Sequence, residues 1–194
     1  MRILLSAEKI QKRIEELAHE IALDYGTEPI TLIGILNGSL MFMADLLREL
    51  KMPTRIGFLR ASSYRGSTTR PGHLEILPGL VPDGRGRHVI LRDDFLDPAG
   101  PFPGVVEFFK GPEPASLKVG VLLRKRGRQE VPLEPDYTGF EIPDLFVIGY
   151  GLDFNDDYRQ LPFIGVLDEA NIHKAHHPEV ITEAVLEASL RTES

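Results

Sequence analysis

The sequence predicts an α/β protein built on a parallel sheet that is flanked by helices. Short apolar runs bounded by turn residues alternate with longer stretches of helical spacing along most of the 194 residues. Several of the apolar runs have no polar alternation, which is typical of parallel strands buried on both faces. The length suits one domain with a substantial core, so we expect a single domain over 1–194.

The first part of the chain is predicted to form a helix, a strand, a helix and a strand. Apolar residues recur at intervals of three and four between Ser6, a good helix cap, and Gly26, a natural stop, so the first helix should reach about Tyr25. A tight polar turn separates the next strand from its helix. The three further elements are expected at Thr31–Leu36, Leu40–Leu50 and Thr54–Leu59.

The segment Arg60–Leu80 interrupts this pattern because it is rich in Ser, Thr, Gly and Arg and has few apolar residues. A loop of that length inside a compact domain is usually functional or mobile. Arg65 and Arg70 would suit an anion, whereas arginines on loops are most often simply solvated. Both interpretations are open.

The rest of the chain returns to strands and helices. The loop after the first of these strands leads through the apolar run Val105–Phe109 into a helix, and Pro178 suits the first turn of a last helix that ends near Leu190. The strands are expected at His88–Leu91, Leu117–Leu123, Leu145–Ile148 and Phe163–Leu167.

Polar side chains gather where the predicted strands end. Three carboxylates follow the His88 strand, and a single polar residue follows each of three other strands. In open α/β sheets the carboxyl ends of the strands form the ligand-binding edge. One such strand end is equally compatible with solvated acids, but the convergence of four favours a site. The residues are Asp93, Asp94, Asp97, Asn37, Lys125 and Asp153.

Composition excludes several other classes of function. A formal net charge of −7 argues against broad binding of nucleic acid, although it leaves room for a local phosphate site. The absence of cysteine excludes disulfides and thiolate chemistry. No apolar run is long enough for a signal peptide or a membrane span, so we expect a cytoplasmic protein. A histidine cluster near the carboxyl end suits either a metal or a solvated linker: His173, His176 and His177.

Taken in order, the motifs of the chain resemble those of the hypoxanthine-guanine phosphoribosyltransferase family. The resemblance covers about Leu4–Leu167 and implies a type I phosphoribosyltransferase fold with a small hood. Residues 168–194 are then an added carboxyl-terminal extension with a helix. The motifs are Ile35–Phe42, Ser62–Tyr64, the acidic strand end, Leu122–Lys125, Gly139–Asp144, Phe146–Asp153 and Tyr158–Arg159.

The resemblance implies an enzyme that joins a 6-oxopurine to phosphoribosyl pyrophosphate and releases pyrophosphate, with Mg²⁺ as cofactor. Asp93 and Asp94 match the acidic pair that holds the ribose hydroxyls, partly through Mg²⁺. Asp97 matches the carboxylate near the purine N7, a general acid or base. Lys125 matches the donor to the 6-oxo group, where negative charge would develop.

The remaining matched positions surround the base and the pyrophosphate. Phe146 would stack on the purine, and Val147 would offer backbone groups to its edge. Asp153 would complete the purine pocket and match a second Mg²⁺ position. Members of the family are homodimers or homotetramers, which implies an oligomer here. Asn37, Gly38 and Arg159 match pyrophosphate-binding positions, and Ser63 and Tyr64 match the flexible loop that closes over the reaction.

The sequence departs from the family where phosphate is bound. The family places a Thr-Gly-x-Thr loop after the catalytic aspartate, but this chain has Pro98-Ala99-Gly100-Pro101. Proline has no N–H, and both hydroxyls are missing, so at least three phosphate donors are absent. The family usually has lysine at the position of Asn37, which brings no charge.

Three interpretations of function follow from these matches and departures. The first is a purine phosphoribosyltransferase of salvage type. The second is a relative that binds a purine base, nucleoside or nucleotide as a sensor without turnover. The third is an enzyme for a different, less phosphorylated substrate. The family motifs favour the first, and the two altered phosphate positions favour the others.

Overall fold

The computed structural model describes residues 1–60, 81–95, 102–111, 113–126 and 134–167 of the chain. Its main sheet has five parallel strands in the order β3-β2-β4-β5-β6. The predicted parallel sheet is therefore confirmed. The strands are β2 (Ile30–Leu36), β3 (Thr54–Arg60), β4 (His88–Phe95), β5 (Ser116–Lys125) and β6 (Tyr137–Ile142).

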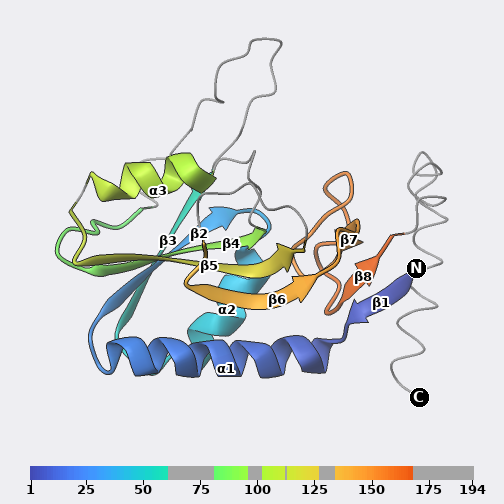
Figure 1. The fold of residues 1–194 in the computed structure, drawn as a ribbon, viewed down its shortest axis with the longest axis horizontal. Helices are drawn as coiled ribbons and strands as arrows, with labels where there is room; N and C mark the ends of the chain where they lie inside the picture. The colour runs from blue at the N-terminus through green and yellow to red at the C-terminus, as the bar shows by residue number, and fades with distance from the viewer. Residues whose placement is uncertain (61–80, 96–101, 112, 127–133, 168–194) are drawn as a thin grey trace, which may run out of the picture.

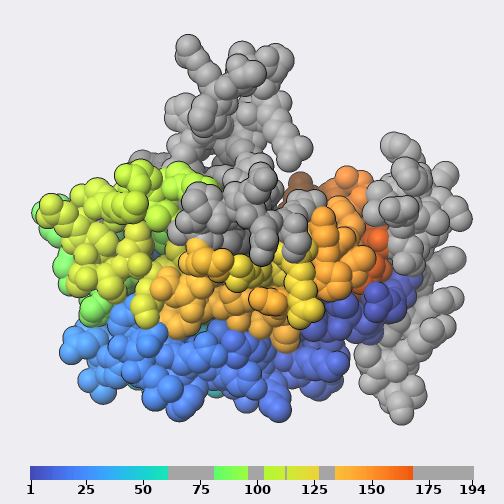
Figure 2. All heavy atoms as spheres, in the orientation of Figure 1, coloured from blue at the N-terminus to red at the C-terminus, as the bar shows by residue number. Residues whose placement is uncertain are grey.

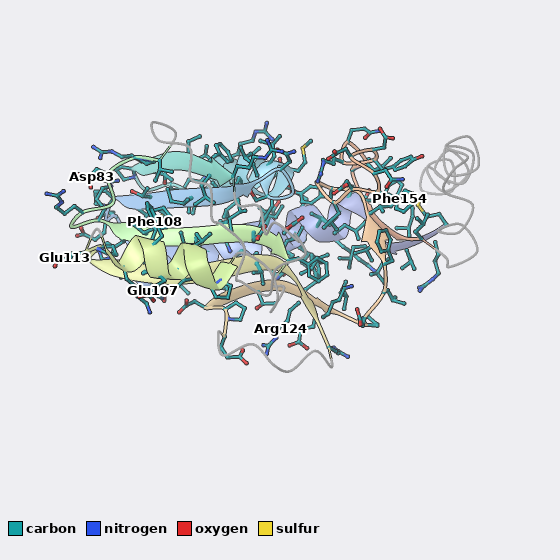
Figure 3. All side chains as sticks on the ribbon, turned by 90° about the horizontal axis from the view of Figure 1, so that it is seen from above. Asp83, Glu107, Phe108, Glu113, Arg124 and Phe154 are labelled. Atoms are coloured by element: carbon teal, nitrogen blue, oxygen red, sulfur yellow. The ribbon has the colours of Figure 1, made fainter. Side chains whose placement is uncertain are left out.

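Helices cover both faces of this sheet (Figure 1). On one face, α1 (Ala7–Tyr25) and α2 (Leu40–Glu49) pack their apolar residues against the side chains that alternate strand positions point toward them. On the other face, α3 (Phe102–Lys110) buries Val105 and Phe109 against Val89 and Leu91 of β4. Phe108 of α3 turns outward, as the view from above shows (Figure 3).

A second sheet of three antiparallel strands lies beside the carboxyl end of the main sheet (Figures 1 and 3). It consists of β1 (Arg2–Leu5), β8 (Ile164–Val166) and β7 (Val147–Ile148), in that order. The first strand of the chain thus pairs with the last described one. This small sheet matches the expected hood and carries Phe154 at its outer end.

The predicted elements of the first part are confirmed, with small shifts at their ends. Ser6 caps α1 by accepting a hydrogen bond from the backbone N–H of Lys9 at 3.4 Å, and Gly26 ends the helix with φ of 59°. In Figure 2, α1 forms one exposed layer along the molecule. No helix among the described residues is long and apolar enough to cross a membrane.

Three differences concern the strands. β4 runs on to Phe95, so Asp93 and Asp94 lie inside the strand rather than after it. The expected strand Leu145–Ile148 is reduced to two residues, and the sequence did not lead us to expect β1 or β6. The last helix, the histidine cluster and nearly all of the Arg60–Leu80 segment lie outside the described residues.

Candidate active site

Two carboxylates from the end of β4 form the acidic part of the site. The backbone N–H of Asp94 donates to Asp93 Oδ1 at 2.8 Å, so the two residues are held together locally. The Asp94 carboxylate lies directly against the turn after β2. A Cβ added at Gly38 would lie only 1.8 Å from Asp94 Oδ2. The absence of a side chain at Gly38 therefore makes room for this acid.

The environment of the pair disfavours two negative charges. Burial raises the pKa of the Asp93 carboxyl well above its usual value, and the neighbouring charge of Asp94 raises it further. Two adjacent carboxylates in such surroundings are stabilised by a cation. Mg²⁺ is commonly held by one or two carboxylates together with waters and substrate oxygens, so these two residues fit that ion.

Replacing Asp93 with asparagine is expected to stabilise the fold. A raised folded-state pKa means that the free energy of unfolding falls as pH rises from about 4, the unfolded value, toward the folded pKa. Above the folded pKa the whole penalty applies. At pH 7.5, D93N should raise the melting temperature by about 2–4 °C, the effect of roughly 1 kcal/mol in a chain of this size.

Thermal unfolding at pH 7.5 and pH 4 measures this effect. The gain should shrink toward pH 4, where the wild-type carboxyl is largely protonated in both states. Glu107, an exposed residue of α3, supplies the control, because E107Q should leave the melting temperature unchanged at both pH values. A D93N protein that is less stable than the wild type at pH 7.5 would contradict the prediction.

The turn between β2 and α2 forms a second wall of the site. Ser39 is buried, and its hydroxyl donates to the carbonyl of Ile35 at 2.5 Å. The backbone N–H of Leu40 donates to the carbonyl of Asn37 at 3.2 Å, and the Leu36–Asn37 peptide bond is cis. Asp94 lies on one side of Gly38 and Gly151 on the other, where an added Cβ would lie 2.1 Å from the Gly38 carbonyl oxygen.

A cavity of about 440 Å³ opens beside this turn. Arg159 lines it and is the one cationic side chain among the described lining residues, which are Asn37, Leu40, Met41, Gly151, Asp156 and Arg159. The guanidinium donates to the Gly151 carbonyl at 2.7 Å. It also forms ion pairs with Asp153 at 2.8 Å and Asp156 at 2.9 Å. An anion entering this cavity meets a cation already shared by two carboxylates.

Lys125 is the last residue of β5, at the same edge of the sheet as the acids. Its ammonium pairs with Asp144 at 2.9 Å and lies 5.0 Å from the centre of the Phe95 ring. Only 18% of the side chain is exposed. The lysine is therefore held in place by a carboxylate and an aromatic ring, not free in solvent as an isolated charge run would be.

Phe146 and Val147 lie where the chain enters β7. Phe146 is 43% exposed and touches Phe154 edge-on, with 5.7 Å between the ring centres. An aromatic ring left open at the sheet edge suits a flat ligand. The backbone N–H of Leu167 donates to the Phe146 carbonyl, and paired residues alternate in antiparallel ladders. The N–H and C=O of Val147 therefore point away from β8, although its side chain is buried.

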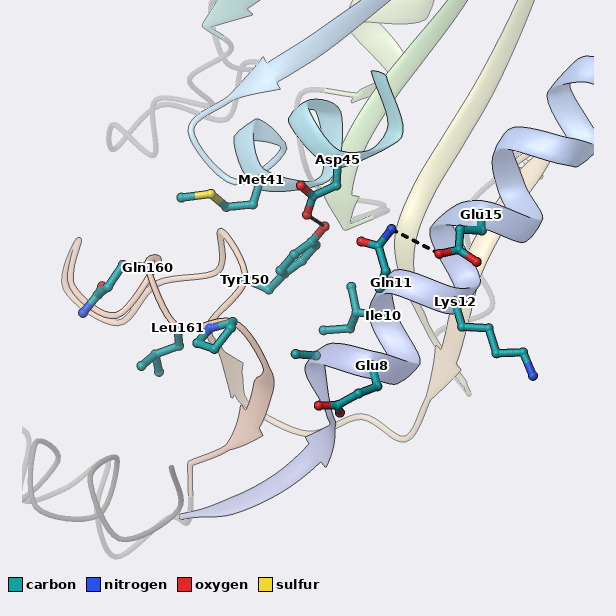
Figure 4. A pocket seen from close by; sticks show the side chains of 12 residues that line it. Glu8, Ile10, Gln11, Lys12, Glu15, Met41, Asp45, Tyr150, Gln160 and Leu161 are labelled. Atoms are coloured by element: carbon teal, nitrogen blue, oxygen red, sulfur yellow. Dashed lines mark hydrogen bonds between the residues drawn. The ribbon is translucent and has the colours of Figure 1, made fainter. Parts of the chain in front are cut away.

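Tyr150 links the hood to α2 on the far side of the turn. Its hydroxyl donates to Asp45 at 2.6 Å, and burial together with this bond raises the pKa of the phenol. The pair lies in a second cavity of about 620 Å³, between α1, α2 and the hood (Figure 4). Met41 lines both cavities. The Tyr150–Asp45 bond thus fixes Gly151, the next residue, in its place against Gly38.

The structure brings most of the predicted site residues to one edge of the molecule. Asp144 and Asp156, which the sequence analysis assigned no role, join them as partners of Lys125 and Arg159. Their acidic type gave no sign of these pairings, which depend on the fold. The catalytic candidate Asp97, the loop residues Ser63 and Tyr64, and Pro98–Pro101 lie outside the described residues. Arg92 is buried in the core and does not line the described cavities.

Comparisons with known proteins agree with this arrangement. A family model described as a phosphoribosyl transferase domain matches residues 2–155. Hypoxanthine-guanine phosphoribosyltransferases of Streptococcus pneumoniae and Bacillus subtilis are each 38% identical to the chain. The first match covers 87% of this chain and 93% of the relative, and the second covers 87% and 94%.

Solved structures give the same result. A hypoxanthine-guanine phosphoribosyltransferase of Bacillus anthracis superposes with a TM-score of 0.81 at 37% identity, covering 87% of this chain and 99% of that one. A hypoxanthine phosphoribosyltransferase of Trypanosoma cruzi superposes with a TM-score of 0.81 at 39% identity, covering 89% and 97%.

Proposed function

The chain belongs to the hypoxanthine-guanine phosphoribosyltransferase family, and we propose that it joins a 6-oxopurine base to phosphoribosyl pyrophosphate in purine salvage, releasing pyrophosphate. The observation that carries this proposal is the packing of Asp94 against the Asn37–Gly38 turn. It places a carboxylate suited to a ribose next to a turn suited to a pyrophosphate, which are the two ends of that one substrate.

The base would bind at the end of β5 and the start of β7. Lys125 donates to the 6-oxo group and stabilises the negative charge that develops there as the purine reacts. Its ion pair with Asp144 aims the ammonium before the substrate arrives. Phe146 stacks on the purine, and the outward-facing N–H and C=O of Val147 bind the base edge and select an oxopurine by hydrogen bonding.

The sugar and its leaving group would bind between β4 and the turn. Asp93 and Asp94 hold the ribose hydroxyls and Mg²⁺, and Asp153 holds a second Mg²⁺ after its bond to Arg159 is exchanged. The ion supplies positive charge for the departing pyrophosphate. Asn37, Gly38 and Arg159 bind the same group through hydrogen bonds and charge. Asp97 exchanges a proton with the purine N7, and Ser63 and Tyr64 close over the site.

Three features of the setting complete the proposal. We place the protein in the cytoplasm, where salvage substrates occur. We expect a homodimer or homotetramer, as the family resemblance implies. We treat 1–194 as one domain, with a core over about 4–167 and a carboxyl-terminal extension over 168–194.

One observation favours a second function, purine binding without transfer. The 440 Å³ cavity has Asn37 where the family usually has lysine, and Arg159 is already paired with two carboxylates. Pro98–Pro101 removes further phosphate donors from the sequence. Both changes weaken the binding of phosphate while leaving the base pocket intact. A sensor of purine bases or nucleosides would have this combination.

The test combines turnover with a variant of the base pocket. Purified protein is incubated with Mg²⁺, phosphoribosyl pyrophosphate and hypoxanthine or guanine, and formation of the nucleoside monophosphate is followed by absorbance. We expect turnover in the wild type. K125A should lower kcat/KM by about 100-fold, the effect of removing one donor from a developing negative charge.

K110A is the matched control, since Lys110 lies on α3 and is exposed. It should leave kcat/KM unchanged. No turnover in the wild type, together with guanine binding in calorimetry that K125A abolishes, would replace the transferase by the sensor. An unchanged rate in K125A would overturn the proposed base pocket.

A further inference from the structure

Arg92 is a buried cation that the proposed mechanism does not use. It lies on β4 immediately before the acid pair and has 0% exposure. None of its three guanidinium nitrogens has a hydrogen-bond partner among the described residues. An arginine in the core normally binds a carboxylate or a carbonyl, so this one requires an explanation.

The sheet provides a trough for this side chain. In the register of the strands, Arg92 lies between Gly34 of β2 and Gly120 of β5, and Gly120 in turn is paired with Tyr137 of β6. The arginine side chain crosses Gly120, where an added Cβ would lie 1.8 Å from Arg92 Nη1. Two glycines in one row thus leave the space that a long flat side chain fills.

Aromatic rings take the place of the missing hydrogen bonds. The guanidinium carbon lies 4.6 Å from the centre of the Phe42 ring and 5.6 Å from that of Tyr137. Tyr137 also faces Lys118, whose ammonium lies 5.2 Å from its centre, and its hydroxyl donates to Asp24. A phenol that donates to a carboxylate has a more electron-rich ring, which strengthens its attraction to both cations.

Burial lowers the pKa of Arg92 to about 9, so the group remains charged at neutral pH. An apolar residue of similar volume at such a position is often as stabilising as a buried charge, or more so. Stability alone therefore does not explain an arginine here.

Three elements of the proposed site meet at the guanidinium. Arg92 itself belongs to β4, which ends in Asp93 and Asp94. Phe42 lies in the first turn of α2, directly after the Asn37–Ser39 turn. Tyr137 begins β6, which leads to Asp144, the partner of Lys125. The contact between Arg92 and Phe42 is the part of this arrangement that joins the acid pair to the turn.

We propose that Arg92 is a positioning residue, which holds the start of α2, and with it the Asn37–Gly38 turn, in register with Asp93 and Asp94 through its contacts with Phe42 and Tyr137. The inference rests on the proposed function for its meaning in catalysis. Its physical content, the position of the turn, does not depend on turnover.

Hydrogen exchange of the backbone amides tests that content directly. In R92M, the amides of residues 39–43, which close the turn and begin α2, should exchange at least ten-fold faster than in the wild type. The amides of α3, on the opposite face of the sheet, should be unchanged. R92K keeps the charge but lacks the flat fork that stacks on rings, so its exchange should be intermediate.

Ligand binding supplies the second readout. R92M should weaken binding of pyrophosphate with Mg²⁺, and raise the KM for phosphoribosyl pyrophosphate, by about 10- to 100-fold, as a small misplacement of binding groups does. The affinity for guanine should stay within two-fold. I90M is the matched control, because Ile90 lies on the same face of β4 two residues earlier. It should change neither readout.

The outcomes separate this proposal from the proposed function. A wild type without turnover would remove the transferase but leave the exchange experiment decisive. Unchanged exchange at residues 39–43 in R92M, or equal losses for guanine and pyrophosphate, would overturn the role of Arg92. If R92M does not fold, F42L removes the ring above an intact arginine and should give the same local increase in exchange.

Discussion

Replacing Gly38 with alanine is expected to lower kcat/KM by at least 100-fold while leaving the protein folded. The added Cβ would lie 1.8 Å from Asp94 Oδ2 and 2.4 Å from its Cγ. No atom can occupy that space, so the Asp94 side chain must turn away. Because only the short side chain of Asp94 has to move, the fold should tolerate the change. A misplaced carboxylate at the centre of a site commonly costs about 100-fold in rate.

Initial rates and thermal unfolding of G38A measure the two parts of this prediction. G111A is the matched control, since its Cβ would meet the nearest atom, the Phe108 carbonyl oxygen, at an ordinary 3.4 Å. Its kcat/KM should equal that of the wild type. If G38A retained wild-type kcat/KM, the contact between the turn and Asp94 would have no role in catalysis.

Gly151 offers an instructive contrast on the other side of the turn. Its φ of 96° is a conformation that favours glycine, and an added Cβ would lie 2.1 Å from the backbone oxygen of Gly38. A backbone atom cannot swing aside as a side chain does. G151A should therefore lower the melting temperature as well as the rate. The difference between the two alanine variants separates displacement of one acid from displacement of the whole turn.

Local signals were sufficient to predict most of the fold. The spacing of apolar residues and the capping by Ser6 placed α1, and uninterrupted apolar runs placed β2, β4 and β5. β6 was missed because Gly139 and the polar residues around it weaken its apolar pattern. The end of β4 was misplaced because consecutive carboxylates are poor strand formers, and the neighbouring strand β5 holds them there. Polar residues that break a local rule at a strand end are a mark of function.

The site was predictable in its members but not in its contacts. Strand ends converge in any parallel sheet, which is why Asp93, Asp94 and Lys125 could be grouped in advance. The pairing of Lys125 with Asp144 and the burial of Arg92 could not, since each depends on residues from other elements. Arg92 stands beside two acids in the sequence, where an arginine is usually solvent-exposed. It is buried because glycines on β2 and β5 leave space for it.

The triple change P98T, A99G and P101T is expected to tighten binding of guanosine monophosphate by about 100- to 1,000-fold. These substitutions restore the Thr-Gly-x-Thr pattern of the family immediately before α3, which begins at Phe102. The positive end of a helix and its free N–H groups favour a phosphate there, but prolines supply neither an N–H nor a hydroxyl. Each charge-assisted hydrogen bond regained is worth about 1.5–3 kcal/mol, so two or three suffice for this gain.

Calorimetric titration of guanosine monophosphate and guanine against both proteins separates this effect from changes in the base pocket. Guanine affinity should stay within two-fold, because the substitutions add donors only for the 5′-phosphate. P53T, an exposed proline ahead of β3, is the control for replacing proline and should alter neither affinity. An unchanged affinity for the nucleotide would mean that another group already binds the phosphate in the wild type. The transferase would then need no repair of this loop, and the argument for a sensor would lose its main support.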